Sequence, residues 1–426
     1  MNVSLLRNRN FVLFVTRESI SLSGTLFLNV SLALYTLAAT GSAASFASVL
    51  ALGIIPQLVL GPFAGTLVDR ADKRRLLMWL DSGRGLLLLL FFLVSSFMPV
   101  RLEMIYVIVL LFAAGDIFVA PASLTLLQRI VRKQDLTHAN ALDTTVVETV
   151  RVLAPFAGTV VYSWAGLHAV FLVGGILCCL CGAAAALIRV EAQRTAGVSS
   201  TILQDMRSSL QPFTRDARIR SLVINGMLTH LFLFPFILVG FPYMIKQLFL
   251  GSDTDFGLVE SMMTAGSLCS LAAVMFLQKR YSLSANIGIG ILGMLLFVCP
   301  LLFLQNEALA SLLGQSPWLV VAFFGGIGFL LFFSFGTYGV FFRTFYQQTV
   351  DSSMLGRFVS VMAMLFSISR FFGFALYGRL FDSDDLLVPV VILGIGMVLK
   401  LLVHLPFLRA EKRLAAEQHQ LEKADL

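Results

Sequence analysis

The chain has 426 residues, of which 58% are hydrophobic and only 13% are charged, and its mean hydropathy is +0.88. A soluble domain is about one quarter charged, so this composition excludes an ordinary water-soluble fold and indicates a membrane protein. The net charge of +7 does not indicate a nucleic-acid partner. The basic residues lie in short clusters between apolar runs, as the positive-inside rule expects.

In chain order, the apolar runs are long enough for twelve transmembrane helices, since about 20 apolar residues cross the hydrocarbon core. The first run is too long for a signal-peptide core, so we take it as the first span. We therefore expect an all-α, multi-pass membrane protein whose solvent is the lipid bilayer. The predicted spans are 11–37, 43–68, 76–98, 103–127, 139–163, 168–189, 218–246, 256–278, 284–304, 318–342, 357–380 and 386–408.

Basic residues predict the orientation of these spans. Of the 31 Lys and Arg residues, 23 lie at the N-terminus, in every second loop or at the C-terminus, and only 3 lie in the other loops. Because cytoplasmic loops carry the excess of Lys and Arg, we expect both termini in the cytoplasm. The expected location is the plasma membrane, which in a bacterium is the cytoplasmic membrane.

The longest hydrophilic connection, 189–220, divides the predicted spans into six and six. Halves of this kind often descend from a repeat, with the substrate path where they meet. Segments 134–158 and 350–374 support a repeat, because each places one arginine in mid-span, Arg151 and Arg370. The predicted organisation is a six-helix bundle over 1–189, a cytoplasmic linker over 190–217, a second six-helix bundle over 218–408 and a charged tail over 409–426.

A charged motif lies between the second and third spans, in "GPFAGTLVDRADKRR" (61–75). Gly61 and Gly65 are four residues apart, which would let a neighbouring helix approach closely. Asp69 and Arg70 follow, and with the later basic residues they are expected to form a tight turn. The spacing of Gly65, Asp69, Arg70 and Arg74 resembles the loop 2–3 signature of the major facilitator superfamily. A degenerate copy, "LQKRYS" (277–282), keeps the basic pair without the aspartate.

Four further segments are similar to the macrolide-efflux branch of drug:proton antiporters. They are "TGSA" (40–43), residues 61–81, the Asn140 entry to the fifth span, and "LGRFVSV" (355–361). The resemblance implies export by alternating access. It also implies a gating role for the loop motif, in contact with 356–358. The expected gating residues are Gly65, Asp69, Arg70, Arg74, Gly356 and Arg357, and we add Asp81 and Arg84 as a local pair on one helix face that supports the gate.

The antiporter signature expected in the fifth span is reduced here to "APFAG" (154–158), with Pro155 and Gly158. That departure weakens the case for an antiporter, although the superfamily signature of the loop is unaffected.

Five charged residues inside the first-half spans are the candidates for proton coupling or substrate binding. A charge at mid-bilayer costs roughly 2.5–3.5 kcal/mol on insertion scales, so such residues face a cavity or a partner. The five are Arg17, Glu18, Asp116, Glu148 and Arg151. Two cations and three acids leave one carboxylate unpaired, and an unpaired acid in an apolar site can take up a proton.

Two interpretations of these charges stay open. In the first, Arg151 pairs with Asp116 or Glu148 and a remaining carboxylate carries the proton. In the second, the charges form a closed, permanent ion-pair network that joins spans one, four and five.

The second half carries fewer deep charges. Arg370 lies in mid-span, and His230 is either a proton relay or a hydrogen-bonded core residue. Lys400 and His404 are expected to reach the membrane interface from the inner end of the last span. The aromatic run over 317–346 would suit a bulky apolar or cationic cargo, or serve packing and lipid contact.

We therefore expect a monomeric secondary transporter that exports amphipathic small molecules against protons. The alternative is a dedicated exporter or flippase for a siderophore, a lipid or a metabolite. A non-transporting membrane enzyme or receptor is disfavoured, because no H-E-x-x-H, G-x-S-x-G or P-loop pattern is present. No cofactor or metal is expected, since the five cysteines lie in apolar segments without further ligands at metal spacing.

Overall fold

The computed structural model describes residues 5, 7–132, 135–190, 216–350, 352–383 and 386–424. Every regular element in this part is helical. The chain forms two compact units, and each is described by itself. Unit 1 is Met1–Gly41, Ser48–Ser199 and Ser252–Ser261, and unit 2 is Ser42–Ala47, Ser200–Gly251 and Met262–Leu426.

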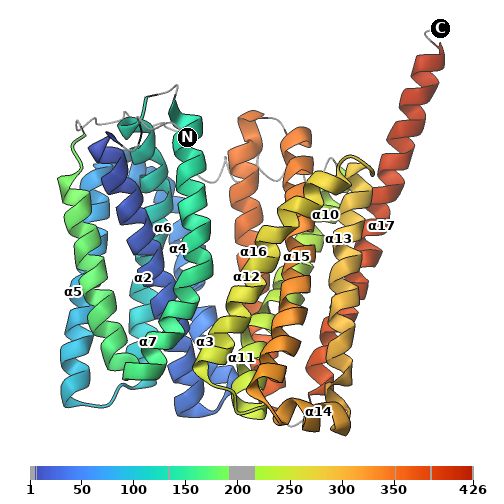
Figure 1. Cartoon of the computed structure of the whole chain (residues 1–426). Helices are drawn as coiled ribbons and strands as arrows, with labels where there is room; N and C mark the ends of the chain where they lie inside the picture. The colour runs from blue at the N-terminus through green and yellow to red at the C-terminus, as the bar shows by residue number, and fades with distance from the viewer. Residues whose placement is uncertain are drawn as a thin grey trace. The chain divides into compact units, whose positions relative to one another are not determined.

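Unit 1 is built around a long helix, α7, which packs against α2 and α5 (Figure 1). Two apolar cores hold it together, one towards each end of its helices. The main helices of unit 1 are α2 (Arg9–Thr40), α4 (Ile55–Arg70), α5 (Lys73–Phe97), α6 (Leu102–Ile130) and α7 (Leu136–Leu187), while α3 (Ala43–Leu52) is divided between the two units.

Helix α7 changes direction at Gly166. Its 52 residues would be about 78 Å long at 1.5 Å per residue, far more than the roughly 30 Å of hydrocarbon in a bilayer. Gly166 has φ 68° and ψ −176°, a conformation that glycine adopts readily because it has no Cβ. Figure 1 shows the two limbs of α7 meeting at a bend. The predicted spans 139–163 and 168–189 lie on either side of it.

Among the described residues, eleven helices are long and apolar enough to cross a membrane. One of these segments, Thr145–Leu187, contains most of predicted span five and all but the end of predicted span six, which accounts for the difference from twelve. The number twelve and the cytoplasmic position of the termini stay predictions.

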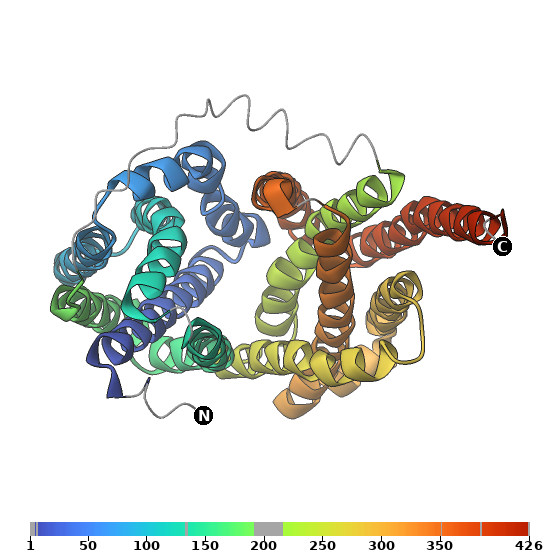
Figure 2. The same ribbon diagram turned by 90° about the horizontal axis from the view of Figure 1, so that it is seen from above.

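Unit 2 contains the remaining helices, except that the first part of α12, up to Ser261, belongs to unit 1. Figure 2 shows two of them, α13 and α17, side by side, and they are in contact. The main elements are α10 (Ala217–Leu228), η2 (Thr229–Leu233), η3 (Phe236–Gly240), α11 (Phe241–Tyr243), η4 (Met244–Leu248), α12 (Asp253–Leu277), α13 (Leu283–Val298), η5 (Cys299–Gln305), α14 (Glu307–Gly314), α15 (Pro317–Thr349), α16 (Ser352–Phe381) and α17 (Leu387–Ala424).

The first span of unit 2 is a helix with repeated π-turns. Proline lacks a backbone N–H and clashes with the preceding turn, and Pro235 and Pro242 lie within this span. The helix widens before, between and after these prolines, at η2, η3 and η4. Before Pro235, the N–H of Phe234 donates to the carbonyl of Thr229, five residues back. Such π-turns occur frequently at functional sites.

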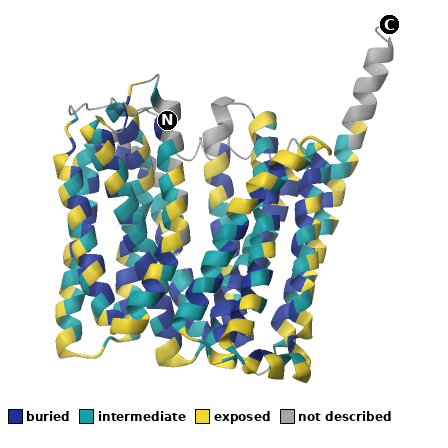
Figure 3. Cartoon of the chain, viewed as in Figure 1, coloured by how far each residue is buried: buried dark blue, intermediate teal, exposed yellow. Residues whose placement is uncertain are grey.

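The outer surface of α5 is apolar. Trp79, Leu86, Leu90, Leu93 and Phe97 recur every three to seven residues and are all exposed. This spacing places them on one stripe of the helix, and Figure 3 shows exposed positions along the outer helices. An apolar stripe of this kind is suited to lipid, in agreement with the composition.

The expected tight turn of the loop motif is shorter than predicted. Helix α4 continues to Arg70 and α5 begins at Lys73, so only Ala71 and Asp72 connect them. Asp72 caps α5, because its carboxylate accepts from the N–H of Arg75 at 3.0 Å. An N-cap aspartate satisfies one of the free N–H groups of the first turn.

The contact of α5 with α7 depends on a glycine. A Cβ at Gly85 would lie 2.5 Å from Cys179 Sγ and 2.8 Å from the Cys179 backbone nitrogen, whereas a Cβ at Gly83 would meet nothing within 4 Å. We expect Gly85→Ala to lower the free energy of unfolding by about 1–3 kcal/mol, as overpacking does. Thermal unfolding of the purified protein in detergent measures this. Gly83→Ala is the matched control, expected to be neutral or slightly stabilising, and equal midpoints for the two variants would contradict the close contact.

Candidate functional site

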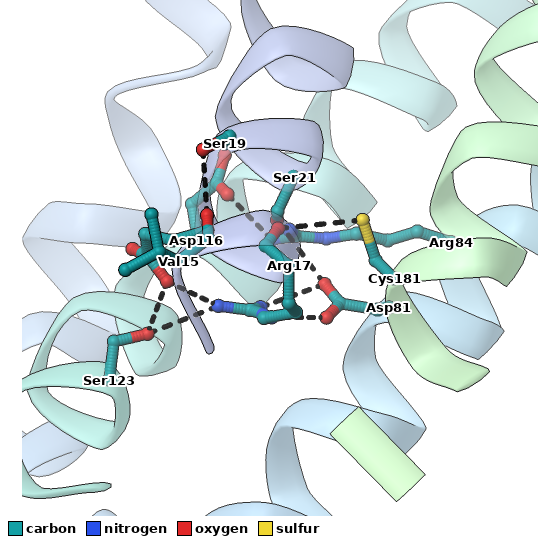
Figure 4. A network of polar contacts seen from close by, with 10 residues as sticks. Val15, Arg17, Ser19, Ser21, Asp81, Arg84, Asp116, Ser123 and Cys181 are labelled. Carbon is teal, nitrogen blue, oxygen red and sulfur yellow. Dashed lines mark hydrogen bonds and ion pairs between the residues drawn. The ribbon is translucent and has the colours of Figure 1, made fainter. Parts of the chain in front are cut away.

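A polar layer separates the two apolar cores of unit 1. Along α2, Phe11 and Phe14 belong to one core, and Phe27 and Leu28 belong to the other. Along α5, Leu77 and Leu88 take the same two places. The charged residues between these positions come from α2, α5 and α6. They form two neighbouring ion-paired groups, one around Arg17 and one at Arg84, and we call the two together the network (Figure 4).

Arg17 of α2 lies at the centre of this layer, with its side chain 0% exposed. Its Nε donates to Asp81 Oδ2 at 2.7 Å and its Nη2 to Asp81 Oδ1 at 2.9 Å. This bidentate arrangement is the strongest geometry available to an arginine and a carboxylate. Ser21 adds a bond to Asp81 Oδ1 at 3.3 Å, and Cys181 of α7 donates to the Arg17 carbonyl at 3.6 Å.

Glu18 is the second carboxylate on Arg17. The Nη1 of Arg17 donates to Glu18 Oε2 at 2.7 Å and to Ser123 Oγ at 3.1 Å. The Ser123 hydroxyl in turn donates to the same Glu18 oxygen at 2.9 Å. Ser123 belongs to α6, so one guanidinium and one hydroxyl join α2, α5 and α6.

Arg84 and Asp116 form the second ion pair, between α5 and α6. The Nη2 of Arg84 donates to Asp116 Oδ1 at 2.7 Å and to the Phe112 carbonyl at 3.0 Å, and its Cζ lies 5.3 Å from the Phe112 ring centroid. The Nε of Arg84 is buried without a hydrogen-bond partner. Gly115 makes room for this side chain, because a Cβ there would lie 2.8 Å from Arg84 Nη2.

The network contains more acid than base. With every group ionised, Arg17 and Arg84 face Glu18, Asp81 and Asp116, which leaves one negative charge in excess. The side chains of Arg17, Asp81 and Arg84 are 0%, 2% and 6% exposed, while those of Glu18 and Asp116 are 20% and 40% exposed. The cations are therefore sealed in the protein, and the two acids that remain accessible are Glu18 and Asp116.

Two predicted pairings are corrected by this geometry. Asp81 and Arg84 were expected to pair locally, but Asp81 binds Arg17 of α2 and Arg84 binds Asp116 of α6. Asp116 was a candidate partner of Arg151, and Arg84 holds it instead. The long arginine side chains reach carboxylates on neighbouring helices. Among the described residues, the network thus joins predicted spans one, three and four, and a link to span five stays a prediction.

Several candidates fall on side chains outside the described part of the chain. The backbone places them on α4, α7 and α16, and their roles stay predictions. They are Gly65, Asp69, Arg70, Glu148, Gly356 and Arg357. Arg151 is described and exposed. Its suggested pairing with Glu148 therefore stays open.

Arg74 has a defined place at the end of α7. Its Nη1 donates to the carbonyls of Ala186 at 3.2 Å and Ile188 at 3.4 Å. A cation at a helix C-terminus satisfies free carbonyls and complements the helix dipole. Arg74 therefore ties the start of α5 to the end of α7, and its gating role stays a prediction.

In unit 2, His230 and Arg370 lie near each other. The His230 ring stacks between Phe234 and Phe366, with centroids 4.9 Å and 4.8 Å away. Its Nδ1 is buried without a hydrogen-bond partner, as is the Nε of Arg370. The positive charge of Arg370 acts on the His230 ring. One prediction made His230 a hydrogen-bonded core residue. Its Nδ1 does not agree with that prediction, because this nitrogen makes no hydrogen bond.

Lys400 and His404 are buried, so the expectation that they reach the membrane interface is wrong. Their side chains are 0% and 2% exposed, because α17 packs against α10 and α13. Lys400 Nζ donates to Thr229 Oγ1 and lies 4.9 Å from the Tyr338 ring centroid. Among the described residues, no carboxylate forms an ion pair with this amine.

The described residues contain no group of three or more His, Cys, Asp or Glu arranged to hold a metal ion. The sequence analysis missed the roles of Ser123 and Gly115, and it did not single out Glu260, an acid inside α12. The only sign of Glu260 in the sequence is a carboxylate within an apolar run. Ser123 and Gly115 give no such sign, because serine and glycine are common in membrane helices.

Comparison with known proteins places this geometry in a family. The family model described as Major Facilitator Superfamily matches residues 18–374. A relative named Macrolide efflux protein A from Streptococcus pyogenes is 22% identical over 371 residues, covering 84% of this chain and 86% of that protein. A protein of the same name from Enterococcus faecalis is 21% identical, covering 75% of this chain and 95% of that protein.

Solved structures with the same fold include two transporters. A bacterial homologue of the iron transporter ferroportin, in an inward-facing state, has a TM-score of 0.74 at 15% identity and covers 95% of this chain and 99% of its own. The nucleoside transporter NupG has a TM-score of 0.69 at 13% identity, covering 97% of this chain and 100% of its own. The chain is a multi-pass transporter rather than an enzyme, resembles macrolide-efflux proteins, and belongs to the Major Facilitator Superfamily.

Proposed function

We propose that this chain exports amphipathic small molecules by alternating access, driven by protons that bind the network of unit 1. The observation that carries the proposal is the single excess carboxylate among Arg17, Glu18, Asp81, Arg84 and Asp116. A group of acids that outnumbers its cations by one in an apolar layer can take up one proton. Perturbed acids of this kind concentrate at functional sites.

Asp116 is the proposed proton carrier. It is the most exposed carboxylate of the network, at 40%, so water reaches it while its partner Arg84 stays buried. Protonation would weaken the charge-assisted bond at Arg84 Nη2, which already shares that nitrogen with the Phe112 carbonyl. One hydrogen bond between α5 and α6 thus depends on the proton.

The same count explains how a proton could be coupled to closure. With one proton bound, two cations face two carboxylates, and the layer is neutral. A neutral layer can be sealed from water at lower cost than a layer with a net charge, because uncompensated charge in a low dielectric is expensive. We propose that the unit closes in the protonated state and needs water contact in the deprotonated state. Glu18 is the second candidate, since it is 20% exposed and shares Arg17 with Asp81.

Export and the bacterial cytoplasmic membrane are supported by the names of the relatives, which are efflux proteins of bacteria. Their cargo class suggests a bulky organic molecule here. A dedicated exporter or flippase of a siderophore, a lipid or a metabolite is the second candidate, favoured if transport is independent of a pH gradient. A monomer is the proposed functional form.

We expect Asp116→Asn to abolish coupling, because an amide cannot exchange the proton. In proteoliposomes, flux of a radiolabelled probe, either erythromycin or naphthyl phosphate, driven by an imposed pH gradient should fall by about tenfold or more, the size of effect that loss of a general acid–base group produces. Exchange without a gradient should persist.

Glu103→Gln is the matched control, an exposed acid in the first turn of the same helix, and it should keep the gradient-driven flux. Glu148→Gln belongs in the same series, since Glu148 stays a candidate. If Asp116→Asn transports as well as the native chain at every pH, the proton carrier is a different residue.

The Arg17–Asp81 pair is expected to serve stability rather than proton exchange. Replacing one partner of a buried pair costs about 3–5 kcal/mol, because a buried charge is left uncompensated. Asp81→Asn should therefore lower the thermal unfolding midpoint far more than Asp116→Asn, whose side chain is partly exposed. The double change Arg17→Met with Asp81→Leu should recover part of the loss. Equal midpoints for Asp81→Asn and the native chain would show that the pair is not structural.

A further inference from the structure

Arg370 is a cation in the middle of α16 that forms no ion pair with any residue the structure describes. Its Nε is buried with no hydrogen bond. An arginine at this depth faces a partner or water, because the unpaired charge is costly in lipid. The residue as a whole is only partly buried.

The described candidate spans that lie wholly in unit 2 contain one carboxylate, Glu411, at the end of the last span. Helix α12, which the two units share, carries its acids Asp253, Asp255 and Glu260 in the part that belongs to unit 1. The charges of Arg370 and Lys400 both act on His230. Among the described residues, the deep charges of unit 2 are therefore mainly positive.

Aromatic rings pack around His230, next to Arg370. Phe366 lies one turn before Arg370 on α16, on the same helix face, and stacks on His230. Phe234 stacks on the other face of that histidine and contacts Phe335 edge-on, with centroids 4.9 Å apart. A guanidinium with a free N–H, an imidazole nitrogen without a partner and several aromatic faces thus lie together at the π-turn Thr229–Leu233.

We propose that Arg370, with His230 beside it, binds an acidic group of the cargo, a carboxylate or a phosphate ester attached to an aromatic or apolar body. The planar guanidinium matches either anion and can donate two parallel bonds to it. The imidazole can donate from the nitrogen that lacks a partner, and the rings receive the apolar body. This assignment rests on the proposed transport function and names its substrate class.

A cationic cargo fits this place less well. The aromatic faces alone would attract an ammonium group, but Arg370 and Lys400 would repel it. Lys400 does not compete for the anion, because protein atoms cover it completely and its Nζ is already bonded to Thr229 Oγ1. The anion site is therefore the Arg370 side of the cluster.

The test is equilibrium binding of tritiated naphthaleneacetate to the full chain in nanodiscs of zwitterionic lipid. Naphthaleneethanol, naphthaleneethylamine and naphthyl phosphate serve as competitors of the same ring. We expect the carboxylate or the phosphate to bind at least about tenfold more tightly than the alcohol, the factor that one charge-assisted hydrogen bond supplies. The amine should bind most weakly. Equal affinities, tightest binding of the amine, or no binding of either anion would overturn the proposal.

Variants locate the site. Arg370→Gln should lose about tenfold in anion affinity, and Arg370→Lys, which keeps the charge, should lose less. Arg379→Gln, on an exposed position of the same helix, is the control and should bind like the native chain. If Arg370→Gln does not fold, the ranking of competitors on the native chain and on Arg370→Lys still decides. Unchanged anion affinity in a folded Arg370→Gln variant would contradict the assignment.

The inference and the proposed proton coupling can fail separately. Asp116→Asn lies in unit 1 and should leave naphthaleneacetate affinity unchanged within about twofold, a difference well under 1 kcal/mol. Anion binding with no effect of Asp116→Asn on gradient-driven flux would support the site and reject the proton carrier. Loss of coupling in Asp116→Asn, together with no preference for anions, would support the carrier and reject the site.

Discussion

The bidentate pair of Arg17 with Asp81 is the interaction on which the amino-terminal unit depends. A guanidinium that is 0% exposed cannot lose its charge by releasing a proton at any ordinary pH, so it must be compensated where it lies. Asp81 supplies that compensation, and Glu18 and Ser123 occupy the remaining N–H group on Nη1. Because these partners come from α2, α5 and α6, the charge fixes how three helices pack between two apolar cores. The proposed proton exchange at Glu18 or Asp116 is compatible with this packing, because Asp81 already compensates the charge of Arg17.

The fold was largely predictable because the bilayer restricts what a chain can do. With no water to satisfy backbone groups, helices and closed barrels are the available spanning structures, and apolar runs of about 20 residues mark the helices. The family resemblance rested on the glycine and charge spacing at 65–75. The bend at Gly166 was not predicted, because glycine is common in membrane helices and its sequence context does not show a positive φ. The π-turns of the first span of unit 2 follow from Pro235, yet proline alone does not tell a kink from a widened helix.

The site was predictable in its residue types and less so in its pairings. Arg17, Glu18 and Asp116 stand out because charged residues inside apolar runs are rare. Asp81 and Arg84 share a helix face three residues apart, and this suggested a local pair. In the structure each extends away from α5, since Arg84 can reach Asp116 only through the space left at Gly115. Which carboxylate each arginine binds depends on how the helices pack, and a single sequence does not show that packing. Lys400 shows the same limit, because a lysine near a helix end snorkels only when no neighbouring helix covers it.

The two units distribute charge in opposite ways, and this separates two tasks that a coupled transporter must perform. In unit 1 there is one carboxylate more than there are cations. One bound proton makes that layer neutral when it is closed off from water, and loss of the proton makes it charged when water reaches it. An arginine that forms no ion pair with a described acid is suited to a ligand that brings the missing charge with it. If both sites were negative, a proton and a cationic cargo would compete for the same acids. With the acid in unit 1 and the free cation in unit 2, an acidic cargo and a proton would bind at different residues, and competition for one carboxylate could not couple them. Coupling would then have to pass through helix positions, of which the α5–α6 bond at Asp116 is the one that a proton directly changes.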